Sequence, residues 1–146
     1  MIIENIPQET FYYLRRTGSF GNENYQLMTE LKEIIREDSL NGEVKAVFGI
    51  PKWNNEIEKS VYDVGFTSKG TIDNKKLGSR LTKGGKYAIF VIPHTAEAVS
   101  LFWQEVAEGA LFKTENFIMD DKRDIMERYE ESLIKQELCE FCIPIK

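Results

Sequence analysis

A repeated order of secondary-structure elements constrains this chain more than any single motif does. Residues 11–16 (FYYLRR) are aromatic and β-prone, and Tyr25–Glu37 follow with apolar residues at helical spacing. In the second half, residues 86–92 (KYAIFVI) have a strong strand pattern, and Glu97–Leu111 carry a second apolar helical stripe. Further strands are predicted after each helix, at residues 44–50, 61–67, 125–129 and 138–145, although Glu127 and Arg128 also suit a helix. The order β-α-β-β therefore occurs twice, which predicts an internal duplication.

This order predicts an α+β fold. Helices of β-α-β-β units pack on one face of an antiparallel sheet, and two such sheets can leave a ligand cleft between the halves. The length of 146 residues indicates a single domain, with repeat halves at about residues 1–70 and 71–146. Residues 51–60 are predicted to form a polar loop, and residues 68–83 an exposed connection. Thr95 is placed to cap the second helix.

Composition and charge narrow the classes of partner. The formal net charge is −5 and no long block of one sign occurs, so direct binding to nucleic acid is not expected. No apolar run approaches the ~20 residues of a membrane span, and the N-terminus lacks the pattern of a secretory signal. We therefore expect a cytoplasmic protein without a membrane partner, in which the two cysteines are reduced.

The Cys-x-x-Cys motif at the C-terminal end predicts neither a metal site nor a redox pair. Residues three apart on a strand point to opposite faces, so the side chains of Cys139 and Cys142 cannot converge. A zinc site needs four ligands, and the chain has a single histidine, His94. Gly84-Gly85 precedes a strand and not a helix, so no phosphate cradle is expected. We expect no metal and no cofactor.

Glu140 is a carboxylate in a segment that otherwise has the pattern of a buried strand. Alternation places Phe141, Ile143 and Ile145 on one face, under the helices, and Glu140 on the other face with Cys142. That second face could be solvated, or Glu140 could pair with a neighbouring lysine or arginine. Glu140 could also serve a ligand, because a carboxylate among aromatic rings loses hydration and gains from a cationic partner.

Four segments together resemble a known family. They are YLRRTGSFGNENYQLMTEL, VYDVGF, GGKYAIF and the ending CEFCIPIK, in this order along the chain. They are similar to the GyrI-like small-molecule-binding domains. These include the effector-binding domains of bacterial multidrug-responsive transcription activators and stand-alone proteins such as a gyrase inhibitor. The resemblance implies a tandem β-α-β-β pair with pseudo-twofold symmetry and a ligand cleft. Because the chain begins at the predicted first strand, without a helix-turn-helix, we expect a stand-alone member.

The resemblance also implies roles for particular residues. The family's cleft carboxylate falls on Glu140, which would hold a small lipophilic or cationic molecule. Aromatic residues would line the cleft, and the candidates are Trp103, Tyr62, Tyr13, Tyr87 and Tyr129. Trp103 also fits a plain core position on the helical stripe. The sequence leaves open whether Tyr62 or Asp63 faces the ligand.

Three functions are therefore open. The first is binding of small lipophilic compounds, cationic ones among them, in an aromatic cleft with a central glutamate. The second is hydrolysis of cyclopropane-bearing genotoxins, because a subset of the stand-alone members resembles hydrolases of such compounds. In this case Glu140 would be the catalytic residue that activates water. The third is interaction with a protein partner such as gyrase. One acid supports both small-molecule functions, and the sequence does not separate them.

Overall fold

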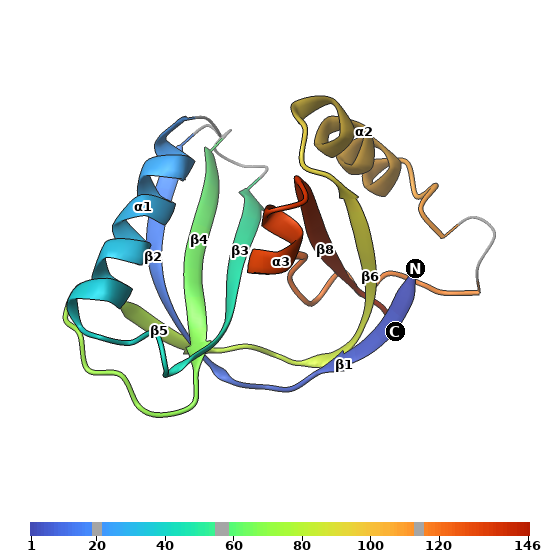
Figure 1. Ribbon diagram of the computed structural model, residues 1–146. Helices are drawn as coiled ribbons and strands as arrows, with labels where there is room; N and C mark the ends of the chain where they lie inside the picture. The colour runs from blue at the N-terminus through green and yellow to red at the C-terminus, as the bar shows by residue number, and fades with distance from the viewer. Residues whose placement is uncertain (19–21, 55–58, 113–115) are drawn as a thin grey trace. The chain divides into compact units, whose positions relative to one another are not determined.

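The computed structural model describes residues 1–18, 22–54, 59–112 and 116–146 (Figure 1). The strands pair antiparallel, and helices occur between some of them along the chain, which confirms the predicted α+β fold. The chain divides into two compact units. The N-terminal unit is residues 7–84, and the C-terminal unit is residues 1–6 with residues 85–146, so both termini belong to the C-terminal unit.

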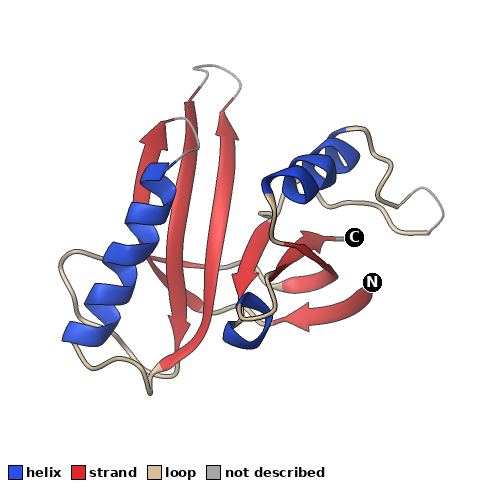
Figure 2. Ribbon diagram, turned by 45° about the horizontal axis from the view of Figure 1, so that its top comes forward, coloured by secondary structure: helices blue, strands red, loops and turns tan. Residues whose placement is uncertain are grey.

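The N-terminal unit is a four-stranded sheet with one helix. Its elements are β2 (Thr10–Gly18), α1 (Asn22–Glu37), β3 (Val44–Asn54), β4 (Lys59–Ser68) and β5 (Gly78–Leu81). The strands pair in the order β3-β4-β2-β5. Figure 2 shows α1 lying along these strands.

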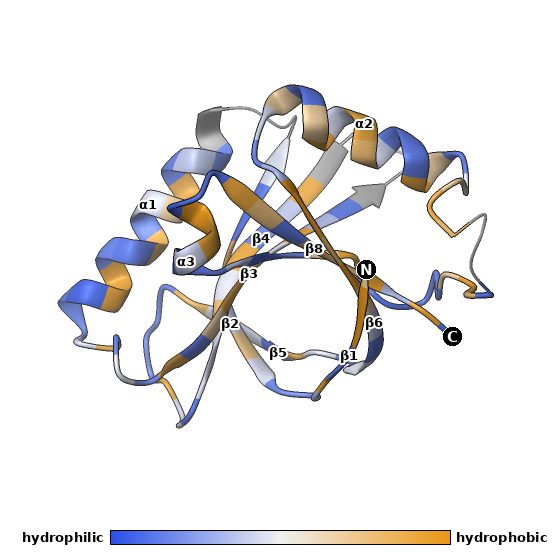
Figure 3. Ribbon diagram, turned by 45° about the vertical axis from the view of Figure 1, so that its right-hand side comes forward, coloured by the Kyte–Doolittle hydropathy of each residue, from blue (hydrophilic) through white to orange (hydrophobic). Residues whose placement is uncertain are grey.

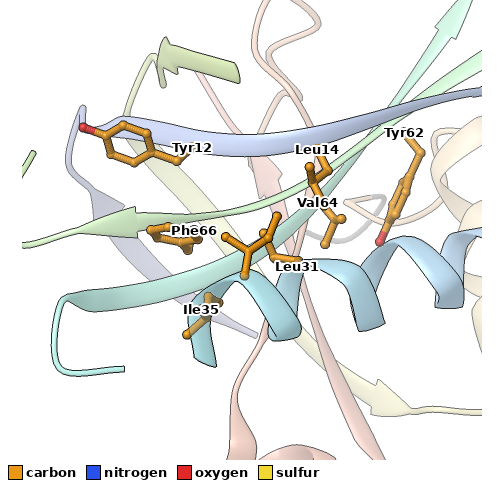
Figure 4. Packing of buried hydrophobic residues seen from close by; sticks show 8 residues of the cluster. Tyr12, Leu14, Leu31, Ile35, Tyr62, Val64 and Phe66 are labelled. Atoms are coloured by element: carbon orange, nitrogen blue, oxygen red, sulfur yellow. The ribbon is translucent and has the colours of Figure 1, made fainter. Parts of the chain in front are cut away.

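Helix α1 forms because its apolar residues recur on one side. Leu31, Ile34 and Ile35 are buried against Tyr12 and Phe66 of the sheet (Figure 4). Most of the remaining positions of α1 carry polar or charged residues, so hydrophilic and hydrophobic segments alternate along it (Figure 3). This confirms the helix predicted from the spacing, which starts at Asn22 and not at Tyr25.

Two predicted loops of the N-terminal unit were partly wrong. The polar loop over residues 51–60 is largely strand, because β3 and β4 stay paired as far as Asn54 and Lys59; residues 55–58 lie outside the described ranges. Within residues 68–83, strand β5 pairs with β2. Gly78 of β5 packs against the Tyr13 ring so closely that a Cβ would lie 2.8 Å from its Cζ. Tyr13 is far from Gly78 in the sequence, so the residues around Gly78 show no strand pattern of their own.

The C-terminal unit repeats this plan. Its elements are β1 (Ile2–Ile6), β6 (Gly85–Pro93), α2 (Ala96–Ala107), β7 (Met126–Tyr129), α3 (Glu131–Ile134) and β8 (Leu138–Pro144). The strands pair in the order β1-β6-β8-β7. Thr95 caps α2, as predicted, and its hydroxyl accepts a hydrogen bond from the Ala98 amide at 3.1 Å. The helix ends at Ala107, before the predicted Leu111.

Strand β1 was missed by the sequence analysis. It joins the C-terminal unit by pairing with β6, where Ile2 lies opposite Ile89 and Ile6 opposite Gly85. Each unit is therefore a β-α-β-β core with one extra edge strand, β5 or β1, next to the strand that precedes its first helix, and the C-terminal unit adds the short helix α3 between β7 and β8. No helix in the described ranges is both long enough and apolar enough to cross a membrane.

Candidate functional site

The two faces of strand β8 differ in chemistry. Phe141 and Ile143 are buried in a cluster with Phe102 of α2, and the Phe102 and Phe141 rings stack with centroids 4.7 Å apart. Since side chains alternate along a strand, Glu140 and Cys142 point to the face opposite α2. This confirms the predicted parity of Glu140, which is buried.

On the face opposite α2, Glu140 belongs to an ion cluster. Arg128 of β7 donates from Nε to Glu140 Oε1 at 2.6 Å. Its two Nη atoms form a fork on Glu4 of β1, with Nη1 2.6 Å from Oε2 and Nη2 3.1 Å from Oε1. The side chains of Glu4, Arg128 and Glu140 are 40%, 19% and 9% exposed. Two carboxylates and one guanidinium give this Glu4–Arg128–Glu140 cluster a formal charge of −1.

The cluster links the two outer strands of the C-terminal sheet. β1 and β7 are the outer strands of the order β1-β6-β8-β7. With strands ~4.8 Å apart, they would be about 14 Å apart in a flat sheet. The Glu4 and Arg128 side chains are long enough to cover most of that distance, and they meet at 2.6 Å. This ion pair therefore crosses the face of the sheet and links its two outer strands.

Charge interactions within the cluster keep both Glu4 and Arg128 ionised at neutral pH. The hydrogen bond from Arg128 lowers the pKa of Glu4 below its usual value of 4.5, against the opposing effect of burial. The bond to Glu4 is the largest factor that raises the pKa of Arg128, and the bond to Glu140 adds to it. Burial raises the pKa of the neighbouring Cys142 thiol to about 12.

Glu140 retains acceptor capacity. Its Oε1 atom accepts from Arg128 Nε, whereas Oε2 accepts no hydrogen bond from any residue in the described ranges. Of the alternatives for Glu140, the structure thus shows pairing with an arginine, but a pairing that uses a single carboxylate oxygen. The second oxygen can accept a bond from a ligand or from water.

The predicted aromatic residues of the C-terminal unit lie on both faces of its sheet. Tyr87 shares the face of Glu140, is buried, and has the Arg123 guanidinium 5.0 Å from its ring centroid. Trp103 packs on the other face, edge-on to the Phe141 ring at 5.5 Å. The structure therefore does not bring Trp103 to the face of Glu140.

Tyr129 also lies away from Glu140. It follows Arg128 on β7, so it points to the face of α2, and its hydroxyl donates to Glu127 at 3.0 Å. Burial is the main cause that raises the pKa of Glu127. The ligand roles predicted for Tyr87, Trp103 and Tyr129 stay predictions.

In the N-terminal unit, Tyr62 and Asp63 face opposite sides. Tyr62 packs under α1 with Leu31 and Val64 (Figure 4), so Asp63 points to the face opposite α1. Tyr13 shares that face and stacks on Phe11 with centroids 5.6 Å apart. The ligand roles of Tyr62 and Tyr13 stay predictions.

Asp63 belongs to a second ion cluster, which the sequence analysis missed. It is fully buried, and both of its oxygens accept from Arg15, at 2.7 and 2.8 Å. Arg80 adds a contact at 3.3 Å. One carboxylate and two guanidiniums give this Arg15–Asp63–Arg80 cluster a formal charge of +1. Both guanidiniums also lie over the Tyr13 ring, 5.2 and 5.5 Å from its centroid.

Strand register shows that the two buried acids occupy equivalent positions. Asp63 lies on β4 four residues before Thr67, which is opposite Phe11 of β2. Glu140 lies on β8 four residues before Pro144, which is opposite Tyr87 of β6.

The edge strands are equivalent in the same way. Arg80 of β5 lies opposite Phe11, and Glu4 of β1 lies opposite Tyr87. An arginine in one unit thus takes the place of a glutamate in the other.

The cysteines of the Cys-x-x-Cys motif are buried and lie on opposite faces of β8. Within the described ranges, no three histidine, cysteine, aspartate or glutamate side chains come together as metal ligands. Cys139 packs on the α2 side, whereas Cys142 lies on the other face, and both are free thiols. Burial raises the pKa of each thiol to about 12, so both stay protonated at neutral pH.

One protein of similar sequence and one solved structure of similar fold match this chain over almost its whole length. The SPbeta prophage-derived protein YosT of Bacillus subtilis (strain 168) is 33% identical over an alignment of 155 positions, which covers 99% of this chain and 97% of YosT. The structure of SAV2435 bound to tetraphenylphosphonium is similar with a TM-score of 0.64, 15% identity, and coverage of 99% of this chain and 93% of that one.

Two further solved structures share the fold. The C-terminal domain of EcmrR has a TM-score of 0.74 at 9% identity, with coverage of 99% of this chain and 96% of that one. A hydrolase from Listeria innocua has a TM-score of 0.65 at 11% identity, with coverage of 99% and 90%. The sequence also matches the GyrI-like small molecule binding domains over residues 1–146. The chain therefore belongs to the family of GyrI-like small molecule binding domains.

Proposed function

We propose that this protein binds a small lipophilic cation through Glu140. The observation that carries the proposal is the state of this carboxylate: it is 9% exposed, and it belongs to a cluster with a formal charge of −1. One of its oxygens is bonded to Arg128, and within the described ranges the other accepts no hydrogen bond. The site therefore offers one unbalanced negative charge and one open acceptor.

Physical chemistry favours a cation that carries apolar groups. A buried charge without a full complement of partners is unfavourable, and a cation that approaches it restores the balance in a medium of lower dielectric than water. A lipophilic cation is weakly hydrated, so it gives up less on leaving water than an ammonium ion would. The solved structure of SAV2435 with tetraphenylphosphonium, on the same fold, supports this class of ligand.

The proposal is tested by isothermal titration of tetraphenylphosphonium into the wild type and the Glu140→Gln variant. The substitution keeps the shape of the side chain but removes its charge, so we expect affinity to fall at least about tenfold. Glu30→Gln is the control, because Glu30 lies on the exposed side of α1 and its replacement changes the net charge equally. Equal affinity of the wild type and the Glu140→Gln variant would refute the role of Glu140.

Hydrolysis of cyclopropane-bearing genotoxins is the second candidate. It is favoured by the open Oε2 atom of Glu140, which could accept a proton from an attacking water. Turnover of such a toxin beyond one equivalent per protein, lost in Glu140→Gln, would support it, and a single equivalent of product would exclude it. Interaction with a protein such as gyrase, and location in the cytoplasm, stay predictions.

A further inference from the structure

We propose that Glu4 and Arg128 set the charge selectivity of the Glu140 site. Glu4 binds and neutralises the Arg128 guanidinium. The negative charge of Glu140 then remains available to a ligand with one positive charge. The inference rests on the proposed function and adds to it two positioning residues and a preference for monocations. It is carried by how Arg128 divides its hydrogen bonds between two carboxylates.

Arg128 is bound more firmly to Glu4 than to Glu140. Its two Nη atoms form a fork on Glu4, at 2.6 and 3.1 Å, whereas a single Nε bond of 2.6 Å reaches Glu140. Forked arginine–carboxylate pairs are stronger and more directional than single contacts. The Nε bond can therefore yield to a ligand while the fork on Glu4 keeps the guanidinium in place.

A count of charges gives the selectivity. With Arg128 and Glu4 forming a neutral pair, Glu140 contributes the remaining charge of −1. One monocation cancels that charge. A neutral ligand would leave a buried negative charge, and a dication would leave an excess positive charge, and both are unfavourable in a buried site.

The N-terminal unit shows what the same framework does with an arginine at the edge. Arg80 occupies the position equivalent to Glu4, and it contacts Asp63 directly. Together with Arg15 it brings three hydrogen bonds to Asp63, and both oxygens of Asp63 are occupied. Asp63 thus has no charge left to offer a cation. In the C-terminal unit, Val91 takes the place of Arg15 and Glu4 that of Arg80, so the equivalent acid Glu140 keeps one oxygen open.

A set of variants tests this by changing the cluster charge in steps. The wild-type cluster has a charge of −1, Glu4→Gln has 0, Arg128→Met has −2, and the double variant Glu4→Gln/Arg128→Met returns to −1. Each protein is titrated with tetraphenylphosphonium and with decamethonium, a dication. Circular dichroism and thermal unfolding of each variant establish that it is folded.

We expect Glu4→Gln to weaken tetraphenylphosphonium binding at least about tenfold, because Arg128 then relies on Glu140 as its carboxylate. The double variant should recover to within about threefold of the wild type, since it restores the charge count. Arg128→Met should tighten decamethonium binding relative to tetraphenylphosphonium. A purely structural role for Glu4 would predict no recovery in the double variant and no change in the preference between the two cations.

The outcomes separate this inference from the proposed function. If Glu140→Gln binds as the wild type does, the proposed function fails. If Glu140→Gln loses binding but Glu4→Gln does not, the inference alone fails, as it does when the double variant binds as weakly as Glu4→Gln. Should Arg128→Met not fold, Glu4→Gln still tests the inference, because the Glu4 side chain is 40% exposed and tolerates replacement.

Discussion

Replacing Asp63 by asparagine should destabilise the N-terminal unit strongly. The side chain is fully buried, and it accepts from Arg15 at 2.7 and 2.8 Å and from Arg80 at 3.3 Å. An asparagine side chain is nearly the same size as that of aspartate but is neutral. The change would therefore leave two guanidiniums facing each other without the carboxylate between them.

The magnitude follows from how exposed each partner is. Removing one member of a buried ion pair costs about 3–5 kcal/mol, whereas exposed pairs contribute ~0–1 kcal/mol. The Arg15 side chain is 46% exposed and that of Arg80 is 22% exposed, so water can screen part of the loss. We expect the free energy of unfolding to fall by about 2–4 kcal/mol. For a chain of this length, that corresponds to a Tm lower by roughly 5–15 °C.

Urea unfolding followed by circular dichroism at pH 7 measures this loss. Asp73→Asn is the matched control, since it changes the same charge at an exposed position. Tetraphenylphosphonium affinity below the unfolding transition should be unaffected by Asp63→Asn. If Asp63→Asn unfolds within about 0.5 kcal/mol of the wild type, a range typical of surface substitutions, the view of Asp63 as a structural ion centre is wrong.

Three further predictions concern the C-terminal unit. Thr95→Ala should lower the free energy of unfolding by about 1 kcal/mol in urea, because α2 loses its cap, and a change below ~0.3 kcal/mol would contradict this. Burial raises the pKa of Glu127 above 4.5, so its protonated form is favoured by folding, and stability is lost as pH rises from 4.5 through the raised pKa. Urea unfolding at several pH values should therefore give a flatter profile for Glu127→Gln than for the wild type, and parallel profiles would refute the shift. Cys139 and Cys142, with pKa values of about 12, should react with a disulfide reagent at pH 8 only as fast as the protein unfolds, so rapid labelling of the native protein would contradict their burial.

Local periodicity was sufficient to predict the elements whose own residue pattern shows which side is buried. Helix α1 was found because Leu31, Ile34 and Ile35 recur at helical spacing, and all three are buried. The two edge strands were missed for a common reason. β1 and β5 are five and four residues long, and each is strand because it pairs with a partner far away in the sequence. Such pairing is set by tertiary contacts, which local propensity does not encode.

The part of the candidate site that lies on a single strand could be predicted from the sequence. Alternation along residues 138–145 placed Glu140 opposite the helix-facing residues, and the structure confirms this. Its partner Arg128 lay on a predicted strand, but only the register of β7 against β8 brings the two together. Glu4 could not be found at all, because β1 was not recognised.

The two buried acids occupy equivalent positions but differ in how many hydrogen bonds they accept. Asp63 and Glu140 lie at the same place in two copies of one framework, yet among the described residues Asp63 has three hydrogen bonds and Glu140 has one. A carboxylate whose acceptors are filled rigidifies its surroundings and has little to gain from a ligand. A carboxylate with an open acceptor and an unbalanced charge gains from one. Arg15 alone fills both oxygens of Asp63, and the equivalent position opposite Glu140 is Val91, so the difference arises from the residues opposite the acid as well as from Arg80 or Glu4 at the edge strand.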